Sequence, residues 1–94
     1  MKLYLIHTGY YDKSIGDGFY EQHTNILIVA KNPPSAKEKV KKNKDYINKK
    51  MHIDGIKEIE NIDGYDLQLN KSSNKEKITS FNHYQVRFLK SKNK

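Results

Sequence analysis

The strongest constraint on the fold is an abrupt change of pattern at residues 31–35. The preceding segment 25–30, Asn-Ile-Leu-Ile-Val-Ala, is the most apolar stretch of the chain, and a short run of β-branched residues is typical of a buried strand. Asn32-Pro33-Pro34-Ser35 then ends the strand and opens a helix, because proline lacks the N–H that the first helical turn does not use. We therefore predict a strand over 21–30, central in its sheet, followed by a helix.

The predicted helix runs to about Lys49. Either Asn32 or Ser35 is suited to be its N-cap, and Ser35 with Glu38 three residues later matches a capping box. The expected apolar stripe consists of Ala36, Val40 and Ile47, with Tyr46 beside it. A stripe this narrow indicates a helix that packs with one side on a sheet and leaves its other sides in water.

Residues 2–10 alternate loosely, which is the pattern of a strand. Alternate residues share a face, with Leu3, Leu5 and His7 on one side and Tyr4, Ile6 and Thr8 on the other. Apolar residues on both sides predict a strand that is covered at least partly on each face. Residues 11–20 contain the Gly, Asp and Ser residues of a turn-rich loop.

The pattern becomes extended again after the helix. Apolar and polar residues alternate over 51–54, and Gly55 then indicates a β-bulge or a close backbone approach. Near the C-terminus, residues 81–89 alternate once more, and we predict a final edge strand there, with a short helix as the alternative. The remaining residues 90–94 form a basic tail, so a single domain is expected over residues 1–89.

Residues 56–69 have the pattern of a hairpin around Asp63-Gly64. A two-residue turn would place Glu60 opposite Leu67 and mix a charge with apolar residues. A three-residue loop ending at a left-handed Gly64 pairs Ile59 with Leu67 instead and keeps the apolar residues on one face. We therefore predict the three-residue loop.

These elements together predict an α+β domain in which one helix packs on a mixed sheet. The order strand–strand–helix–strand–strand (ββαββ) is that of a β-grasp or ubiquitin-like roll. A ferredoxin-like sandwich is the alternative, but it requires a second helix that only residues 73–81 could supply, and their composition is poor for a helix.

The composition limits the classes of protein that the chain can belong to. Its 94 residues are 35% apolar and 31% charged, so one thin core is expected. The absence of cysteine excludes disulfides, zinc ribbons and thiol nucleophiles. The apolar run at the N-terminus is too short for a signal peptide or a membrane span, so we expect a cytoplasmic protein without membrane association.

The formal net charge of +7 raises the question of nucleic-acid binding. Only Arg87 among the 18 basic residues is an arginine, whereas nucleic-acid readers usually exploit the planar guanidinium. A weak, salt-dependent attraction to polyanions through the helix remains an alternative function. The candidate residues for it are Lys37, Lys41, Lys44 and Lys49.

The polar residues that most invite a chemical role are Glu21, Gln22, His23, His52 and Asp54. Glu21 and His23 are two apart on a predicted strand and so share a face, as do His52 and Asp54 on another. If those strands are neighbours, the four side chains converge into an inventory that suits a divalent metal such as zinc. The competing interpretation is a structural hydrogen-bond network, so we assign no cofactor and no metal, and keep His23, His52 and Asp54 as metal candidates.

Three short motifs, in order, carry a family resemblance: Glu21-Gln22-His23, His52-Ile53-Asp54 and Ile62-Asp63-Gly64-Tyr65. Together with the N-terminal Met1-Lys2-Leu3 strand, they resemble a small bacterial family known as domain of unknown function 1543. The resemblance covers about residues 1–70. It implies a small α+β domain, in one or two copies per protein, and no known activity.

Two departures from the family pattern are visible. The segment Ser14 to Phe19 stands where the family has a glycine-rich turn, and the residues after Leu69 are not covered by the resemblance.

No catalytic motif accompanies these residues. There is no nucleophile elbow and no phosphate-binding glycine loop, and we do not expect an enzyme. The favoured function is a non-enzymatic interaction module that binds a protein partner or a second copy of itself, as a homodimer, through a sheet edge or an aromatic loop. The residues of that aromatic loop are Tyr10, Tyr11, Phe19 and Tyr20. The alternatives are the polyanion binder and a metal-dependent site, which would support metal-assisted hydrolysis, at His23 and His52.

Overall fold

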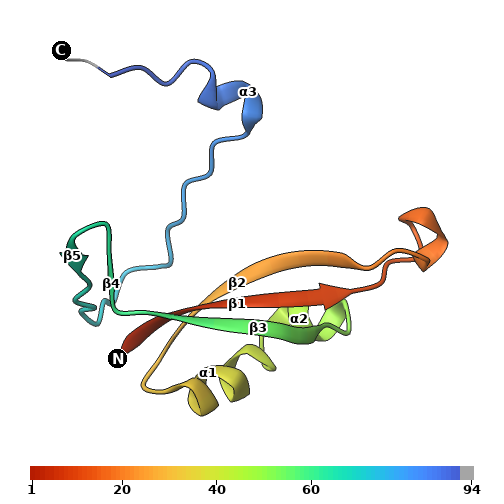
Figure 1. Ribbon diagram of the computed structural model, residues 1–94, viewed down its shortest axis with the longest axis horizontal. Coiled ribbons are helices and arrows are strands. Elements are labelled where there is room, and N and C mark those ends of the chain that lie inside the picture. Colours follow the sequence, from red (N-terminus) through yellow and green to blue (C-terminus); the bar gives the residue numbers. More distant parts are fainter. Residues whose placement is uncertain (92–94) are drawn as a thin grey trace.

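The computed structural model describes residues 1–91. Its elements are, in chain order, β1 (Lys2–Tyr10), the 3-10 helix η1 (Gly16–Gly18), β2 (Gln22–Ala30), α1 (Pro33–Val40), α2 (Lys44–Asn48), β3 (His52–Ile59), β4 (Asn61–Ile62), β5 (Tyr65–Asp66) and α3 (His83–Val86). β1, β2 and β3 form one sheet, with α1 and α2 on one of its faces, and β4 and β5 form a separate hairpin (Figure 1). The predicted α+β class is therefore confirmed.

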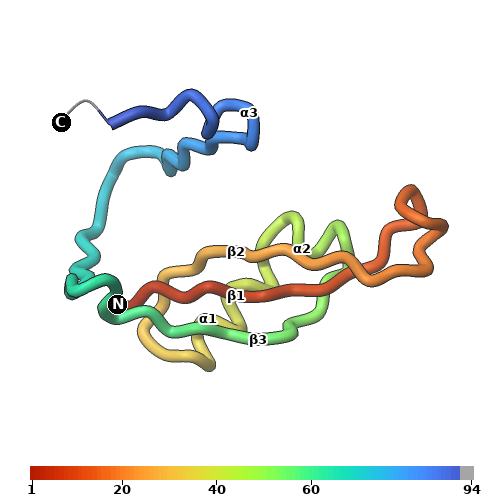
Figure 2. The backbone as a smooth tube through the Cα atoms, turned by 45° about the horizontal axis from the view of Figure 1, so that its top comes forward, coloured from red at the N-terminus to blue at the C-terminus, as the bar shows by residue number. Residues whose placement is uncertain are grey.

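The central strand of the sheet is β1. The strand order is β2-β1-β3 (Figure 2), and β1 pairs antiparallel with both neighbours. The prediction that the apolar strand β2 is central was wrong. Its apolar residues on one face lie under the helix, whereas Leu27 on the other face is 52% exposed and has only Leu5 of β1 opposite it.

The expectation of a mixed sheet was also wrong, since every strand pairing in residues 1–91 is antiparallel. The β-grasp order is not confirmed. The ferredoxin-like alternative lacks its second helix, because residues 73–81 are not helical. Among residues 1–91, the structure contains no helix long and apolar enough to cross a membrane.

The core lies between the sheet and α1. It consists of Tyr4, Ile6, Ile28, Ala30, Ala36 and Val40. Tyr4 is fully buried, and its hydroxyl donates a hydrogen bond to Glu58 Oε1 at 2.6 Å. Burial, helped by this bond to a carboxylate, raises the pKa of Tyr4 to about 12. The same bond lowers the pKa of Glu58, and the carboxylate thereby ties β3 to the central strand.

The predicted helix is two helices. Asn32 is the N-cap of α1, because its side chain accepts a hydrogen bond from the N–H of Ser35 at 2.8 Å. The chain then leaves the helix after Val40, and the Asn43 side chain caps α2 by accepting from the backbone of Asp45 and Tyr46. A continuous helix to Lys49 was therefore the wrong prediction.

The break in the helix has a local cause and a consequence for packing. The asparagine side chain offers the backbone N–H groups a partner outside the helical ladder, which favours a cap over a helix interior. The predicted stripe is right for Ala36 and Val40, which are buried, and for Tyr46, which packs against the core. It is wrong for Ile47, which belongs to the separate helix α2 and is 58% exposed.

The hairpin has the register that the sequence analysis rejected. Asp63 and Gly64 both have positive φ, 56° and 83°, and form a two-residue turn that pairs Ile62 with Tyr65. The N–H of Leu67 bonds to the carbonyl of Glu60 at 2.9 Å. Asp-Gly tolerates two positive φ values, which the two-residue turn requires. The apolar face that was used to choose the three-residue loop is exposed, so it does not set the register.

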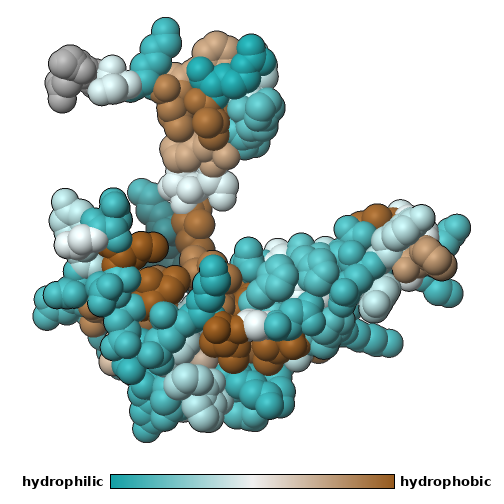
Figure 3. All heavy atoms as spheres, viewed as in Figure 1, coloured by the Kyte–Doolittle hydropathy of each residue, from teal (hydrophilic) through white to brown (hydrophobic). Residues whose placement is uncertain are grey.

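The C-terminal segment carries a short helix, which was the alternative to the edge strand that we predicted there. In α3, Asn82 and Gln85 form a capping box, with each side chain bonded to the other residue's backbone N–H. The segment runs away from the sheet (Figure 1), and its apolar residues are exposed around α3 (Figure 3). The last residues of the predicted basic tail, 92–94, lie outside the described part of the chain, and the single domain over 1–89 stays a prediction.

Candidate functional site

The face of the sheet opposite the helices carries a group of ionisable side chains at one end. We call Glu21, His23, His52 and Asp54 the His/carboxylate cluster. They flank the central strand at Gly9, which pairs with His23 on one side and with His52 on the other. The two strands that supply the cluster are therefore not neighbours, as the sequence argument had required. Their side chains meet across Gly9 because this position has no side chain.

Both histidines contact both carboxylates. His52 Nε2 lies 2.6 Å from Glu21 Oε2 and 3.2 Å from Asp54 Oδ1. His23 places its Nδ1 3.2 Å from Asp54 Oδ2 and its Nε2 3.3 Å from Glu21 Oε1. The four side chains are between 31% and 47% exposed, so the cluster is open to solvent on one side.

The backbone of Gly9 lies directly beneath the side chains of the cluster. A Cβ at this position would lie 2.6 Å from each of three atoms: Asp54 Oδ2, Glu21 Oε2 and His52 Nε2. Contacts this short do not occur at real Cβ atoms. This arrangement of the three donor atoms is therefore possible only because residue 9 has no side chain. Three donor atoms from two different strands therefore surround one point just above the backbone of the third.

A β-bulge in β3 lies at Asp54, a member of the cluster. The register between β1 and β3 shifts between His7 and Thr8: Thr8 faces Ile53, whereas His7 faces Gly55, and Asp54 is the extra residue. The predicted bulge at Gly55 is thus confirmed. Alternation already places Asp54 on the same face as His52, and the bulge resets the register beyond it, so that Ile56 as well as Ile53 packs against the core.

Two further polar residues border the cluster, and sequence reasoning did not assign them to it. The rings of His7 and His23 stack, with centroids 4.9 Å apart and planes inclined by 6°. His7 Nδ1 lies 2.9 Å from Asn25 Oδ1. The available signal was the spacing of two, since His7 precedes Gly9 by two residues and Asn25 follows His23 by two. That signal needed the pairing of β1 with β2, which the sequence did not supply.

The bordering residues also line a hollow on the same face of the sheet. Its volume is about 570 Å³, and its walls are Leu5, His7, Asn25, Gly55, Ile56 and Lys57. The cluster therefore lies beside a space large enough for a small molecule, with both apolar and polar side chains in its walls.

The donor atoms fall into two sets, each with all its donors within 4.8 Å of one another. One set is Glu21, His52 and Asp54, and the other is His7, His23 and Asp54. Gln22, which the sequence grouped with these residues, is not among them; its side-chain amide donates to the carbonyl of Tyr20 at 3.3 Å.

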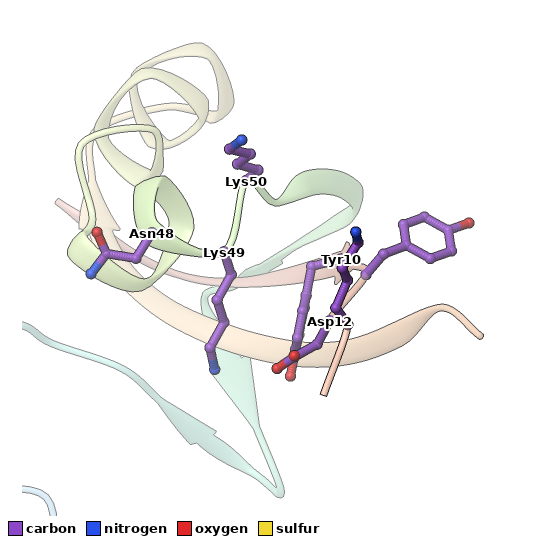
Figure 4. Close-up of a pocket in the computed structure, with 7 residues that line it drawn as sticks. Tyr10, Asp12, Asn48, Lys49 and Lys50 are labelled. Atoms are coloured by element: carbon purple, nitrogen blue, oxygen red, sulfur yellow. The ribbon is translucent and has the colours of Figure 1, made fainter. Parts of the chain in front are cut away.

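The four candidate lysines do not gather at one point. Lys41 lies 3.4 Å from the carboxylate of Glu38, and Lys49 lies over the ring of Tyr10, 5.0 Å from its centroid. A cavity of about 420 Å³ adjoins Lys49, but Lys49 and Lys50 extend in opposite directions there (Figure 4). Lys37 and Lys44 are exposed elsewhere on the helices. Polyanion binding by these residues stays a prediction.

The aromatic loop presents large exposed side chains. Tyr11 is 58%, Phe19 78% and Tyr20 64% exposed, and Phe19 and Tyr20 contact each other edge to face. These rings contribute nothing to the core that the described residues form.

Fold and site together define a small α+β protein with a His/carboxylate cluster on the open face of an antiparallel sheet. Residues 18–69 match the family described as Domain of Unknown Function (DUF1543), and the chain belongs to this family. The resemblance drawn from the three motifs is therefore confirmed, and the match includes every member of the cluster but not the strand that carries Gly9. Comparison with curated proteins and with solved structures gives no significant match.

Proposed function

We propose that this protein binds a divalent transition-metal ion through Glu21, His52 and Asp54. The observation that carries the proposal is the convergence above Gly9, where donor atoms of these three side chains lie at the same 2.6 Å from one point. An imidazole nitrogen with two carboxylate oxygens suits zinc and its first-row neighbours. The ion itself would lie farther from the backbone than that point, within bonding distance of the three donors.

The spacing of the donors supports an ion between them. Ligand bonds of about 2.0–2.2 Å separate neighbouring ligand atoms by roughly 3.0–3.5 Å. The 3.2 Å between His52 Nε2 and Asp54 Oδ1 falls in this range. The 2.6 Å between His52 Nε2 and Glu21 Oε2 is a hydrogen-bond length, and these two atoms would separate by a few tenths of an ångström when an ion replaces the shared proton.

Three protein ligands leave coordination positions open for water or for a small molecule. The hollow beside His7 and Asn25 gives such a molecule a place next to the ion. An ion in an open site of this kind would also suit metal-assisted hydrolysis. We propose binding of the ion, which the convergence of the donors supports by itself.

The test is a calorimetric titration of Zn²⁺ into protein purified without a histidine tag. We expect saturable binding by the wild type and a loss of at least about 100-fold in affinity for His52→Ala, since a ligand is removed and even indirect supports of a metal site cost 10–100-fold. His83→Ala is the matched control, because His83 lies in α3 and in neither donor set. Equal affinities for all three proteins, or no binding by the wild type, would refute the proposal.

A second function, association with a protein partner or with another copy of this chain, is supported by the exposed rings of the aromatic loop. β2 and β3 also pair only with β1 within residues 1–91, so each offers an edge. The test is light scattering over a range of protein concentrations, with Phe19→Ser compared with the wild type. A concentration-dependent dimer that Phe19→Ser weakens supports this function; a monomer at every concentration and no effect of Phe19→Ser contradict self-association.

A further inference from the structure

Each carboxylate of the cluster directs its two oxygens to different imidazoles. Asp54 directs Oδ1 to His52 and Oδ2 to His23, at 3.2 Å in each case. Glu21 does the same, with Oε2 on His52 and Oε1 on His23, at 2.6 and 3.3 Å. A carboxylate that served a single ion would need only one oxygen, or both on the same side. Here each carboxylate spans the gap between the two imidazoles.

We propose that the cluster is a dinuclear metal site in which Asp54 bridges two divalent ions. This inference rests on the proposed function and adds a second ion to it. The first ion is held by Glu21, His52 and Asp54, and the second by His7, His23 and Asp54, the two sets of donors that share only this aspartate. In two-metal sites the ions lie about 3.5–4 Å apart, which is the separation that one carboxylate can bridge with its two oxygens.

His7 makes a hydrogen bond of the kind that supports metal-bound histidines. Its Nδ1 lies 2.9 Å from Asn25 Oδ1, and an amide oxygen can only accept. The tautomer that donates from Nδ1 to this oxygen has Nε2 as the nitrogen that would bind an ion. A hydrogen bond to the other ring nitrogen is the usual support of a metal-bound histidine.

The ring of His7 lies against that of His23 at the second position. Their centroids lie 4.9 Å apart and their planes are inclined by only 6°. Because parallel rings direct their nitrogen lone pairs in parallel planes, one ring must turn about its Cβ–Cγ bond before both bind the same ion. Together with Asp54 Oδ2 at 3.2 Å from His23 Nδ1, they supply two nitrogens and one oxygen. The second position is thus richer in nitrogen than the first, which has one nitrogen and two oxygens.

The two positions differ in expected affinity. Two doubly charged ions carry more positive charge than the two carboxylates of the cluster can neutralise, so the second ion binds against the field of the first. We expect two binding steps, of which the second is weaker and is helped by an anion from solution that shares the excess charge.

The experiment counts the ions. Mn²⁺ is titrated into tag-free wild-type protein and followed by electron paramagnetic resonance, which distinguishes free ions, isolated bound ions and magnetically coupled pairs. The wild type should bind two ions per chain and show the coupled signal as the second one enters. His7→Phe should keep the ring stack on His23, bind one ion and lose the coupled signal, while His83→Phe should behave as the wild type.

The outcomes separate this inference from the proposed function. A single ion in the wild type, still bound by His7→Phe, overturns the dinuclear site and leaves the proposed function standing. No bound ion in the wild type overturns both. Because the count in the wild type decides by itself, the test does not depend on whether His7→Phe folds. Asp54→Asn should weaken both steps, and two ions bound to it with wild-type affinity would exclude Asp54 as the bridge.

Discussion

Replacing Gly9 with alanine is the most direct perturbation of the site, because it adds one methyl group at the point where the donors converge. That Cβ would lie 2.6 Å from Asp54 Oδ2, Glu21 Oε2 and His52 Nε2, whereas ordinary contacts begin at 3.4 Å. To regain ordinary contact, each of the three atoms must retreat by about 0.8 Å, the difference between these two distances.

The retreat has a calculable effect on metal binding. Donors pushed apart on all sides of one point cannot all remain at about 2.0–2.2 Å from a single ion, so at least one bond to the metal is lost. We expect the affinity for Zn²⁺ to fall by at least about 100-fold, since the loss of indirect supports alone costs 10–100-fold. A 100-fold loss corresponds to about 2.7 kcal/mol of binding free energy.

The same substitution should leave the fold in place. Gly9 is not among the glycines with positive φ, so alanine fits its backbone. Replacing glycine at a compatible position stabilises a protein by about 0.4–1 kcal/mol through the unfolded chain. The contacts to three partly exposed side chains oppose this gain. The free energy of unfolding without metal should therefore change by less than about 1 kcal/mol.

The assay is urea denaturation with and without Zn²⁺, together with calorimetric titration. Zn²⁺ at about 100 times its dissociation constant should stabilise the wild type by about 2.7 kcal/mol, and Gly9→Ala should lose most of this increment. Gly55→Ala is the matched control, because it lies in the same sheet and a Cβ there meets no atom within 4 Å. If Gly9→Ala binds Zn²⁺ as tightly as Gly55→Ala does, the donors do not hold the ion above Gly9 and the reasoning is wrong.

Three further predictions concern the fold. Ile6→Ala should lower the free energy of unfolding by about 2–5 kcal/mol because Ile6 is fully buried. Ile47→Ala should change it by less than about 0.5 kcal/mol because Ile47 is 58% exposed. Equal losses for the two variants in urea denaturation would contradict the packing of α2. Asn32→Ala should cost about 1 kcal/mol in the same assay through loss of the α1 cap, and no change would show that the cap bond is not formed in solution. The hydrogen bond from Tyr4 holds the pKa of Glu58 below its ordinary value of 4.5. Ionised Glu58 therefore stabilises the fold above pH 4.5, and this stabilisation is lost as the pH falls through the lowered pKa of the folded state. Glu58→Gln should therefore flatten the loss of stability below pH 4.5, and parallel acid unfolding of both proteins would contradict this assignment.

The parts of the fold that depend on neighbouring residues were readable from the sequence. The alternation of residues 2–10 predicted β1 with its observed ends, and Pro33-Pro34 predicted the start of α1. The α2 cap at Asn43 and the capping box of Asn82 and Gln85 were also local signals, and overlooking them produced the over-long helix and the false final strand. These errors were errors of interpretation, since hydrogen bonds over two or three residues need no tertiary information.

The parts that depend on strand pairing were not readable. The apolar content of β2 suggested a central strand, but the position of a strand in a sheet depends on which neighbours it finds, and β3 pairs with β1. The hairpin register followed the turn rather than the apolar pattern, because the hairpin buries no face.

The site shows the same division. The sequence by itself determined that Glu21 shares a face with His23 and His52 with Asp54, because side chains two apart on a strand point the same way. Only the tertiary structure decided that the two pairs meet. They meet because β1 lies between their strands and is bare at Gly9, and because the two strand registers place both His23 and His52 opposite that glycine. Both conditions depend on residues far apart in the chain, and no pattern within one strand contains them.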